Sequence, residues 1–296
     1  MKNIALAKTI GRLAYESLAP DQEAFLTGVT SRGLFVRIGD SRVIFLSFET
    51  CRSPLTLTLT EDAAELRSLE HGSPVRLTSG QLIFPDAGVA VTVHPSAVWQ
   101  QPPPSHPARP VAEQLDNLRF FAAQVAFAKN GQGFSALLPP LLGLQTTTAP
   151  DNGPLLTTLL RLRQALRSAD VLASAETIGK LLGMGNGLTP SGDDVVAGLL
   201  LALDRWRPVL WPGGDLGRLN ALVVEAAYKA TTTLSANLIE CAAQGESDER
   251  LVTALDSIVT GQPAASECAP LLLGWGNSSG ADALVGMTLA LTALST

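Results

Sequence analysis

Residues 191–203 read SGDDVVAGLLLAL, and a near copy, SGADALVGMTLAL, occupies residues 279–291. A serine, a glycine, an aspartate, a second glycine and a Leu-Ala-Leu triplet keep the same spacing in both copies. Each copy follows a Gly-x-Gly-Asn element, at residues 183–186 and 274–277. Both stretches are nearly apolar all round, which is typical of helices at the centre of a bundle. The repeat therefore predicts two buried central helices whose N-termini are built alike.

The repeat also predicts where the N-termini of these helices lie. Gly198 and Gly286 hold the same position in the two copies and would let the helices pack closely. A helix N-terminus attracts anions through its unpaired N–H groups and its positive dipole end. Glycines ahead of the first turn let the backbone approach a ligand closely, as in phosphate loops. We therefore expect both glycine loops to converge on one polar pocket.

Apolar residues spaced by three and four predict further helices after residue 110. They are expected over residues 111–129, 154–169, 219–244 and 249–261, in a bundle of seven or eight helices. Short polar side chains crowd the middle of the third segment. These side chains are Thr232, Thr233, Ser235 and Asn237. They are expected either to hydrogen-bond back to carbonyls of their own helix or to line the pocket.

Residues 20–99 instead consist of short β-rich runs. Residues 33–48 hold two runs around Gly39-Asp40-Ser41, which predicts a hairpin. Residues 55–59 and 75–94 supply further strands, and one short helix is expected near 61–70. The pattern indicates a small barrel or sandwich.

The segment QQPPPSHPARP at residues 100–110 separates the two regions and is typical of a stiff surface linker. The sequence thus predicts an α+β chain. A small antiparallel β barrel or sandwich occupies a domain at residues 1–99, and a mainly α-helical bundle occupies residues 111–296.

Composition excludes several classes of protein. The chain has 296 residues and a net charge of −6, which argues against non-specific nucleic-acid binding. The longest apolar runs fall short of the ~20 residues of a spanning helix, and residues 1–20 lack the apolar core of a signal peptide. Cys51, Cys241 and Cys268 form no disulfide framework. We expect a cytoplasmic protein that binds neither nucleic acid nor membranes.

Most candidate catalytic and binding residues lie in or next to the two glycine loops. Asp193, Asp194 and Asp282 are expected to form a carboxylate cluster that orients a substrate amide or holds a metal ion, with Mg²⁺ favoured over Zn²⁺. Ser191 joins these three as a candidate catalytic residue. The candidate residues for binding substrate or anion are Gly185, Asn186, Gly187, Thr189, Gly192, Asn277, Ser278, Ser279, Gly280, Thr232, Thr233 and Ser235. The alternative is that Ser-Gly-Asp-Asp is only a helix cap.

Other catalytic patterns do not fit the sequence. The glycines are not followed by the Gly-Lys-Ser/Thr of a phosphate-binding P-loop, and the segment ahead of them looks helical rather than strand-like. His71, His94 and His106 all precede residue 111, so histidine-dependent chemistry in the bundle would need one of them to reach across.

Three segments resemble the AllH (YlbF-like) subunit family of oxamate carbamoyltransferase, long filed as a domain of unknown function or a putative carboxylase. They are GMGNGLTPSGDDVVAGLL at 183–200, TTTLSANLIECAAQG at 231–245 and LGWGNSSGADALVGM at 273–287. The family loop G-x-G-x-G-L-T-P-S-x-D-D is kept. The later family motif commonly begins Gly-His, whereas this chain has Trp275, so that position is not expected to be catalytic.

The resemblance implies a carbamoyltransferase that works within a multisubunit complex in allantoin and purine catabolism. Oxalurate and phosphate would be converted reversibly to oxamate and carbamoyl phosphate, with FdrA-like and AllG-like subunits as partners and with the chain in an oligomer. Two alternatives stay open. The chain could be a non-catalytic assembly subunit of that complex, or a stand-alone enzyme acting on another small carboxylate or carbamoyl compound.

Overall fold

The computed structural model describes residues 3–20, 22–60, 64–128, 132–144 and 153–293. The chain forms two compact units, Met1–Pro102 and Pro103–Thr296, each with its own hydrophobic core.

The first unit is a closed β barrel. Its strands are β1 (Asn3–Gly11), β2 (Glu23–Thr30), β3 (Gly33–Ile38), β4 (Arg42–Ser47), β5 (Thr56–Leu59), β6 (Pro74–Thr78), β7 (Gln81–Phe84), β8 (Val89–Thr92) and β9 (Val98–Trp99). The order is β5-β4-β3-β2-β6-β7-β8-β1, and β1 also pairs with β5, which closes an eight-stranded barrel. The short β9 pairs with the end of β1. The predicted fold class is confirmed.

Alternating side chains fill the barrel. In β6 and β7, Val75, Leu77, Leu82 and Phe84 are buried, while their neighbours along the strand are more exposed. The hairpin predicted at residues 33–48 is β3 and β4. The helix expected near 61–70 is a 3₁₀ turn, η1 (Ala64–Ser68), in the described part of that segment.

The barrel differs from the expected strand pattern in two details. Strand β1 lies ahead of the predicted β region, and it pairs in parallel with β8 and antiparallel with β5. Its apolar side chains Ile4 and Leu6 are 73% and 54% exposed. This part of the strand therefore lacks the buried apolar face by which a strand is predicted from sequence. Strands β4 and β5 also pair in parallel, so the sheet is not antiparallel throughout.

The second unit is helical. Its helices are α2 (Val111–Ala128), α3 (Leu138–Leu141), α4 (Gly153–Arg167), α5 (Val171–Gly179), α6 (Ser191–Arg205), α7 (Arg207–Leu210), α8 (Leu216–Ala230), α9 (Thr233–Ala242), α10 (Glu249–Thr260), α11 (Ala265–Leu273) and α12 (Ser279–Ala293). The described residues therefore hold more helices than the seven or eight expected. Several of the additional ones, such as α3 and α7, are single turns.

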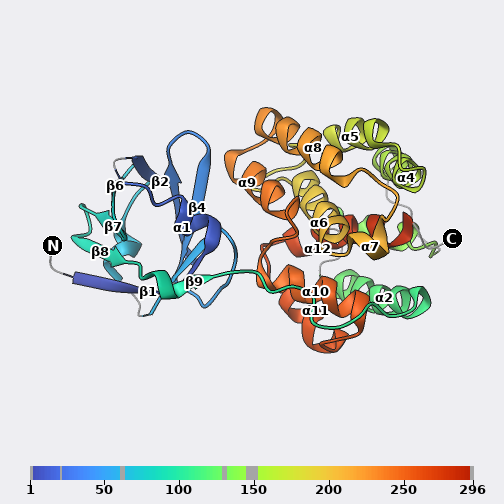
Figure 1. The fold of residues 1–296 in the computed structure, drawn as a ribbon, viewed down its shortest axis with the longest axis horizontal. Coiled ribbons are helices and arrows are strands. Elements are labelled where there is room, and N and C mark those ends of the chain that lie inside the picture. Colours follow the sequence, from blue (N-terminus) through green and yellow to red (C-terminus); the bar gives the residue numbers. More distant parts are fainter. Residues whose placement is uncertain (1–2, 21, 61–63, 129–131, 145–152, 294–296) are drawn as a thin grey trace. The chain divides into compact units, whose positions relative to one another are not determined.

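Helices α6 and α12 form the centre of the helical unit. They lie between α4, α5, α8 and α9 on one side and α2, α10 and α11 on the other (Figure 1). Their residues are buried along almost the whole of both helices, as the repeat predicts. The backbones touch where the repeat places its second glycine. A Cβ on Gly198 would lie 2.1 Å from the carbonyl oxygen of Ala283, and one on Gly286 would lie 2.0 Å from that of Val195.

The helix expected over residues 219–244 is two helices, and the prediction of one continuous helix is wrong. Helix α8 ends at Ala230 and α9 begins at Thr233. The break occurs because Thr232 adopts an extended conformation and caps α9, its hydroxyl accepting from the Ser235 N–H. Apolar periodicity continues across the break, so it does not reveal the cap.

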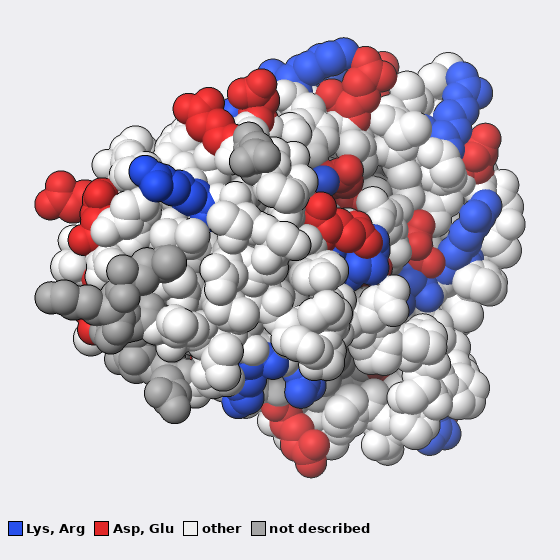
Figure 2. Space-filling view, turned by 60° about the vertical axis from the view of Figure 1, so that its left-hand side comes forward, with Lys and Arg blue, Asp and Glu red and all other residues white. Residues whose placement is uncertain are grey.

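No helix in the described ranges is long and apolar enough to cross a membrane. On the face shown in Figure 2, Lys and Arg side chains are scattered among Asp and Glu and do not gather into one basic area. This distribution agrees with the acidic net charge of −6.

Replacing Gly198 with alanine should destabilise the helical unit. Its Cβ would overlap a backbone carbonyl that cannot move without separating α6 from α12. We expect Gly198→Ala to lower the free energy of unfolding by about 3 kcal/mol, the upper end for overpacking. Urea unfolding followed by tryptophan fluorescence measures this.

Gly179→Ala is the matched control. Gly179 is also helical, but a Cβ there meets nothing within 4 Å. This variant should be neutral or gain up to about 1 kcal/mol from reduced chain entropy. Equal destabilisation of both variants would contradict the close crossing.

Candidate functional site

The glycine loop before α6 is tied to the buried carboxylate of Asp193. The Gly183 N–H donates to Asp193 Oδ1 over 2.8 Å, and the Thr231 hydroxyl donates to Asp193 Oδ2. Asp193 is 2% exposed. Both of its oxygens are therefore used to hold the loop against the start of α9.

A second contact joins the same two segments. The Thr232 hydroxyl donates to the carbonyl of Leu188 over 2.8 Å. The junction between α8 and α9 thus holds the glycine loop at two points, through Thr231 and Thr232.

The two copies of the repeat turn into their helices in the same way. The Gly192 N–H donates to the carbonyl of Met184, and the Gly280 N–H donates to the carbonyl of Trp275, its counterpart in the repeat. A Cβ on Gly192 or Gly280 would lie 2.0 Å from a backbone carbonyl oxygen. These glycines therefore serve a close backbone approach within the fold.

The N-termini of α6 and α12 meet, as the repeat predicts. The Thr189 and Ser279 hydroxyl oxygens, one from each copy, are 3.4 Å apart. The side chain of Asp194 lies near Ser279 of the other helix, and that of Asp282 lies near Ser191 of the first. Each serine thus pairs with the aspartate of the opposite copy.

This pairing changes the role expected for Ser191. The residue before α6 is Pro190, which provides no side-chain cap, and Ser191 is the first helical residue. The alternative that Ser191 only caps its own helix is wrong, because Pro190 occupies the cap position and Ser191 lies near Asp282.

Asp194 and Asp282 are held in a dry environment. Burial raises the pKa of the Asp194 carboxyl well above its usual value, although hydrogen bonds from Ser279 and Thr189 oppose this. Burial likewise raises the pKa of Asp282. The Phe134 N–H, which donates to Oδ1 of Asp282 over 2.6 Å, acts in the opposite direction and lowers that pKa. In the described part of the chain, Oδ2 of Asp194 and Oδ2 of Asp282 have no hydrogen-bond partner. A protonated carboxyl suits such a site.

The exposed part of the first loop offers backbone N–H groups. Gly185 and Gly187 have φ of +114° and +101°, with Asn186 between them at negative φ. Backbone that alternates in handedness can turn successive N–H groups towards one side, where they bind an anion. In the two glycine loops, the backbone N–H groups of ten residues donate no hydrogen bond to any described residue: Gly185, Asn186, Gly187, Leu188, Thr189, Ser191, Gly276, Asn277, Ser278 and Ser279.

The predicted site residues thus fall into two layers. The exposed layer contains Gly185, Asn186, Gly187 and Asn277, with Thr189, Ser191 and Ser278 partly covered. The aspartates, Gly192, Ser279 and Gly280 are buried beneath it. Thr232 contacts the loop through its hydrogen bond to Leu188, whereas Ser235 is buried in α9. Thr233 is the first residue of α9, and its hydroxyl forms no hydrogen bond with the described residues.

Three residues at this site were not predicted from the sequence. Thr231 holds Asp193, and Phe134 holds Asp282 from a segment about 150 residues away. Gly133 packs so closely on Asp282 that a Cβ would lie 2.3 Å from Oδ1. The sequence signal for Thr231 is its place in the Thr-Thr-Thr run, and there is no local signal for the other two.

The metal prediction gains no support from the geometry. The described ranges contain no group of three or more His, Cys, Asp or Glu side chains arranged to hold a metal ion. Both carboxylate oxygens of Asp193 already accept hydrogen bonds, from Gly183 and Thr231. Metal binding by Asp193, Asp194 and Asp282 stays a prediction.

This part of the chain is similar to a known protein family. Residues 181–291 match the family model described as oxamate carbamoyltransferase subunit AllH. The match spans both glycine loops, both central helices and the α8–α9 junction. No solved structure matches the chain.

The raised pKa of Asp194 predicts a pH-dependent stability. Because its pKa is higher in the folded state, this group stabilises the fold below the unfolded value of 3.8, and the contribution is lost as pH rises through the folded pKa. Asp194→Asn removes the ionisation and keeps the shape. We expect this variant to unfold less readily than the native chain at pH 7, by about 1.4 kcal/mol for each unit of pKa shift.

Asp193→Asn is the matched comparison, since the neighbouring carboxylate accepts two hydrogen bonds. It should lose about 1–3 kcal/mol, because an amide nitrogen cannot accept one of them. Urea unfolding between pH 4 and about 8 measures both variants. Equal losses in both variants would contradict the different roles given to the two residues.

Proposed function

We propose, from the match of residues 181–291 to the AllH family, that the chain is a subunit of an oxamate carbamoyltransferase system. Its reaction would transfer a carbamoyl group between oxalurate with phosphate and oxamate with carbamoyl phosphate. The family match supports the system, and the two glycine loops are the residues that we assign to the reaction.

The chemistry of this transfer defines what the site must supply. The bond between the carbamoyl carbon and the oxamate nitrogen breaks, a bond between that carbon and a phosphate oxygen forms, and the nitrogen takes up a proton. Every reactant and product carries negative charge. The site must therefore bind anions, stabilise an oxyanion as the carbonyl becomes tetrahedral, and pass one proton.

The free N–H groups of the first loop carry the proposal. Gly185, Asn186 and Gly187 expose consecutive N–H groups that have no acceptor in the described structure. The loop precedes the N-terminus of α6, where the helix dipole also favours negative charge. We assign phosphate or carboxylate binding to this loop, with Asn277 and Ser278 of the second loop completing the site.

The aspartates have different proposed roles. Asp193 positions the loop through Gly183 and Thr231 and does not touch substrate. Asp194 and Asp282 orient the Ser279 and Ser191 hydroxyls, and as protonated carboxyls they can supply the proton for the departing nitrogen through those hydroxyls. A chain with this site would act beside partner subunits, for which FdrA-like and AllG-like proteins are the proposed candidates.

Ligand-induced stabilisation of the purified chain tests the proposal. Phosphate, carbamoyl phosphate, oxamate and oxalurate are each added with and without Mg²⁺. A ligand that binds only the native state adds about 2.7 kcal/mol at a hundred times its Kd, which raises the melting temperature visibly. We expect phosphate and carbamoyl phosphate to stabilise the chain.

Gly187→Ala should abolish this stabilisation. A Cβ at Gly187 meets nothing within 4 Å, so the change acts only through the backbone, which at φ +101° disfavours alanine and turns the loop N–H groups away. Gly72→Ala is the matched control in the barrel. It carries φ +87°, also with open space, and should keep the full ligand effect.

The alternatives give different results. Stabilisation that is equal in native chain and Gly187→Ala would contradict the loop as the anion site. Absence of any shift, both for the chain alone and after reconstitution with partner subunits, would favour a non-catalytic assembly role. Turnover by the isolated chain would mark a stand-alone enzyme.

A further inference from the structure

A cavity of about 270 Å³ lies in the helical unit, away from the glycine loops. Ser105 and His106 form one wall, from the proline-rich segment ahead of α2, and Thr253, Asp256 and Thr260 form another, from α10. Gln262 and Pro263 follow α10 and complete the lining. At ~30 Å³ per water, the cavity has room for about nine waters or one small molecule.

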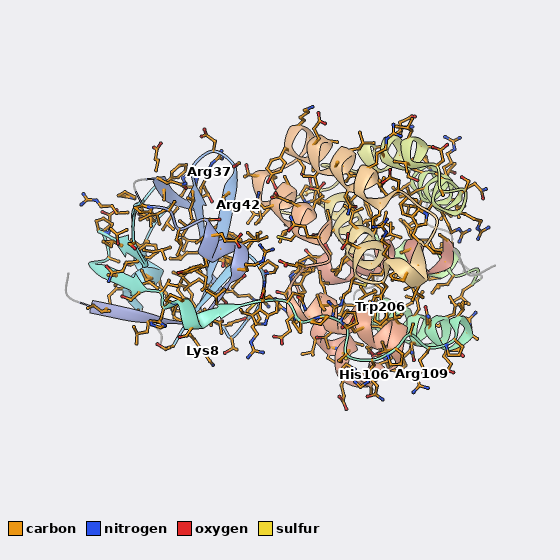
Figure 3. All side chains as sticks on the ribbon, viewed as in Figure 1. Lys8, Arg37, Arg42, His106, Arg109 and Trp206 are labelled. Atoms are coloured by element: carbon orange, nitrogen blue, oxygen red, sulfur yellow. The ribbon has the colours of Figure 1, made fainter. Side chains whose placement is uncertain are left out.

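Hydrogen bonds hold the proline-rich wall in place. The Arg109 N–H donates to the carbonyl of Val259 over 2.9 Å, and Arg109 Nε donates to that of Thr260 over 3.2 Å. Gln114 of α2 donates to the Arg109 carbonyl over 2.7 Å. Figure 3 marks Arg109 and His106 on this segment. The cavity is therefore formed before any ligand arrives.

The carboxylate in the cavity is already neutralised. Arg205 donates from Nε to Asp256 Oδ1 over 2.8 Å and from a terminal nitrogen to Oδ2 over 2.7 Å, and Trp206 Nε1 donates to Oδ1 over 3.0 Å. The Arg205 side chain is only 5% exposed. A guanidinium bound to both oxygens opposes a metal cation there, while the carboxylate opposes an anion. Oδ2, with one donor, can still accept a ligand N–H.

The remaining polar groups can both donate and accept hydrogen bonds. In the described ranges, the side chains of Ser105, His106, Thr253 and Gln262 form no hydrogen bond with the protein. The Gln262 amide can form a paired N–H···O=C contact with another amide. Such a reciprocal pair needs a donor and an acceptor in one plane, as a primary amide or urea provides and a polyol does not.

We propose that this cavity binds a small uncharged molecule bearing a primary amide or urea group. Its N–H groups would donate to Asp256 Oδ2 and to the side-chain carbonyl of Gln262, and its carbonyl would accept from both His106 and Thr253. Arg205 lies fourteen residues from Ser191 along α6, about 21 Å at 1.5 Å per residue. The inference therefore concerns a second site and does not rest on the proposed function.

Aromatic ¹H–¹³C spectra of the full chain test it with biuret as the probe. The sequence has three histidines, so His71 and His94 of the barrel serve as internal controls for His106. We expect biuret to shift the His106 ring signals saturably, with a dissociation constant on the order of 1–10 mM for so small a ligand. His71 and His94 should not move.

Thr253→Val should weaken biuret binding about fivefold, the effect of one lost hydrogen bond. Thr177→Val on α5 is the matched control, since Thr177 bonds back to Ala173 of its own helix. Glycerol, acetate and methylammonium should leave His106 unmoved. Equal shifts in all three histidines, a glycerol effect equal to that of biuret, or unchanged binding by Thr253→Val would overturn the proposal, as would the absence of a saturable His106 shift in the native chain.

Discussion

Backbone contact between α6 and α12 is the constraint on which the helical unit depends. Gly198 and Gly286 bring the two helices so close that no side chain fits between them. This crossing fixes the register of the pair and makes the two N-termini meet. The exchange of serine and aspartate partners between the two copies follows directly, because each first turn faces the other and not solvent. Neither central helix can therefore shift along its axis without breaking contacts at its partner's first turn.

Two electrostatic demands are met at this junction by different means. The helix dipoles place partial positive charge beneath the loops, where the buried carboxylate of Asp193 lies. The N–H groups of Gly185, Asn186 and Gly187 donate no hydrogen bond to the described residues, and these three residues are exposed. The hydrogen bonds of the buried layer thus stabilise the fold, whereas the exposed layer keeps N–H groups that can bind a molecule from solution. Asp193 connects the two layers, since it is buried yet bound to the first glycine of the loop.

Much of the architecture could be predicted from the sequence, because its signals are local or periodic. The repeat predicted the central helices, and the paired glycines predicted their crossing. The division of labour between Asp193 and Asp194 could not be predicted, since adjacent helical residues point about 100° apart into surroundings set by distant segments. Phe134 and Gly133 meet Asp282 only through tertiary packing, and the cap at Thr232 interrupts an apolar pattern that continues across it. Strand β1 was hidden for a related reason, because its partners lie some 50 to 90 residues away.

The two loops are alike in design but not in length. Four residues separate Asn186 from Ser191, whereas one separates Asn277 from Ser279. The helices beneath them form a two-fold symmetric frame, and such a frame with equal loops would offer two equivalent half-sites. The longer first loop breaks that symmetry, so the junction presents one extended arm and one short one. The repeat therefore produces two loops of unequal length at one junction, and the anion site proposed above would bind one small anion for each chain.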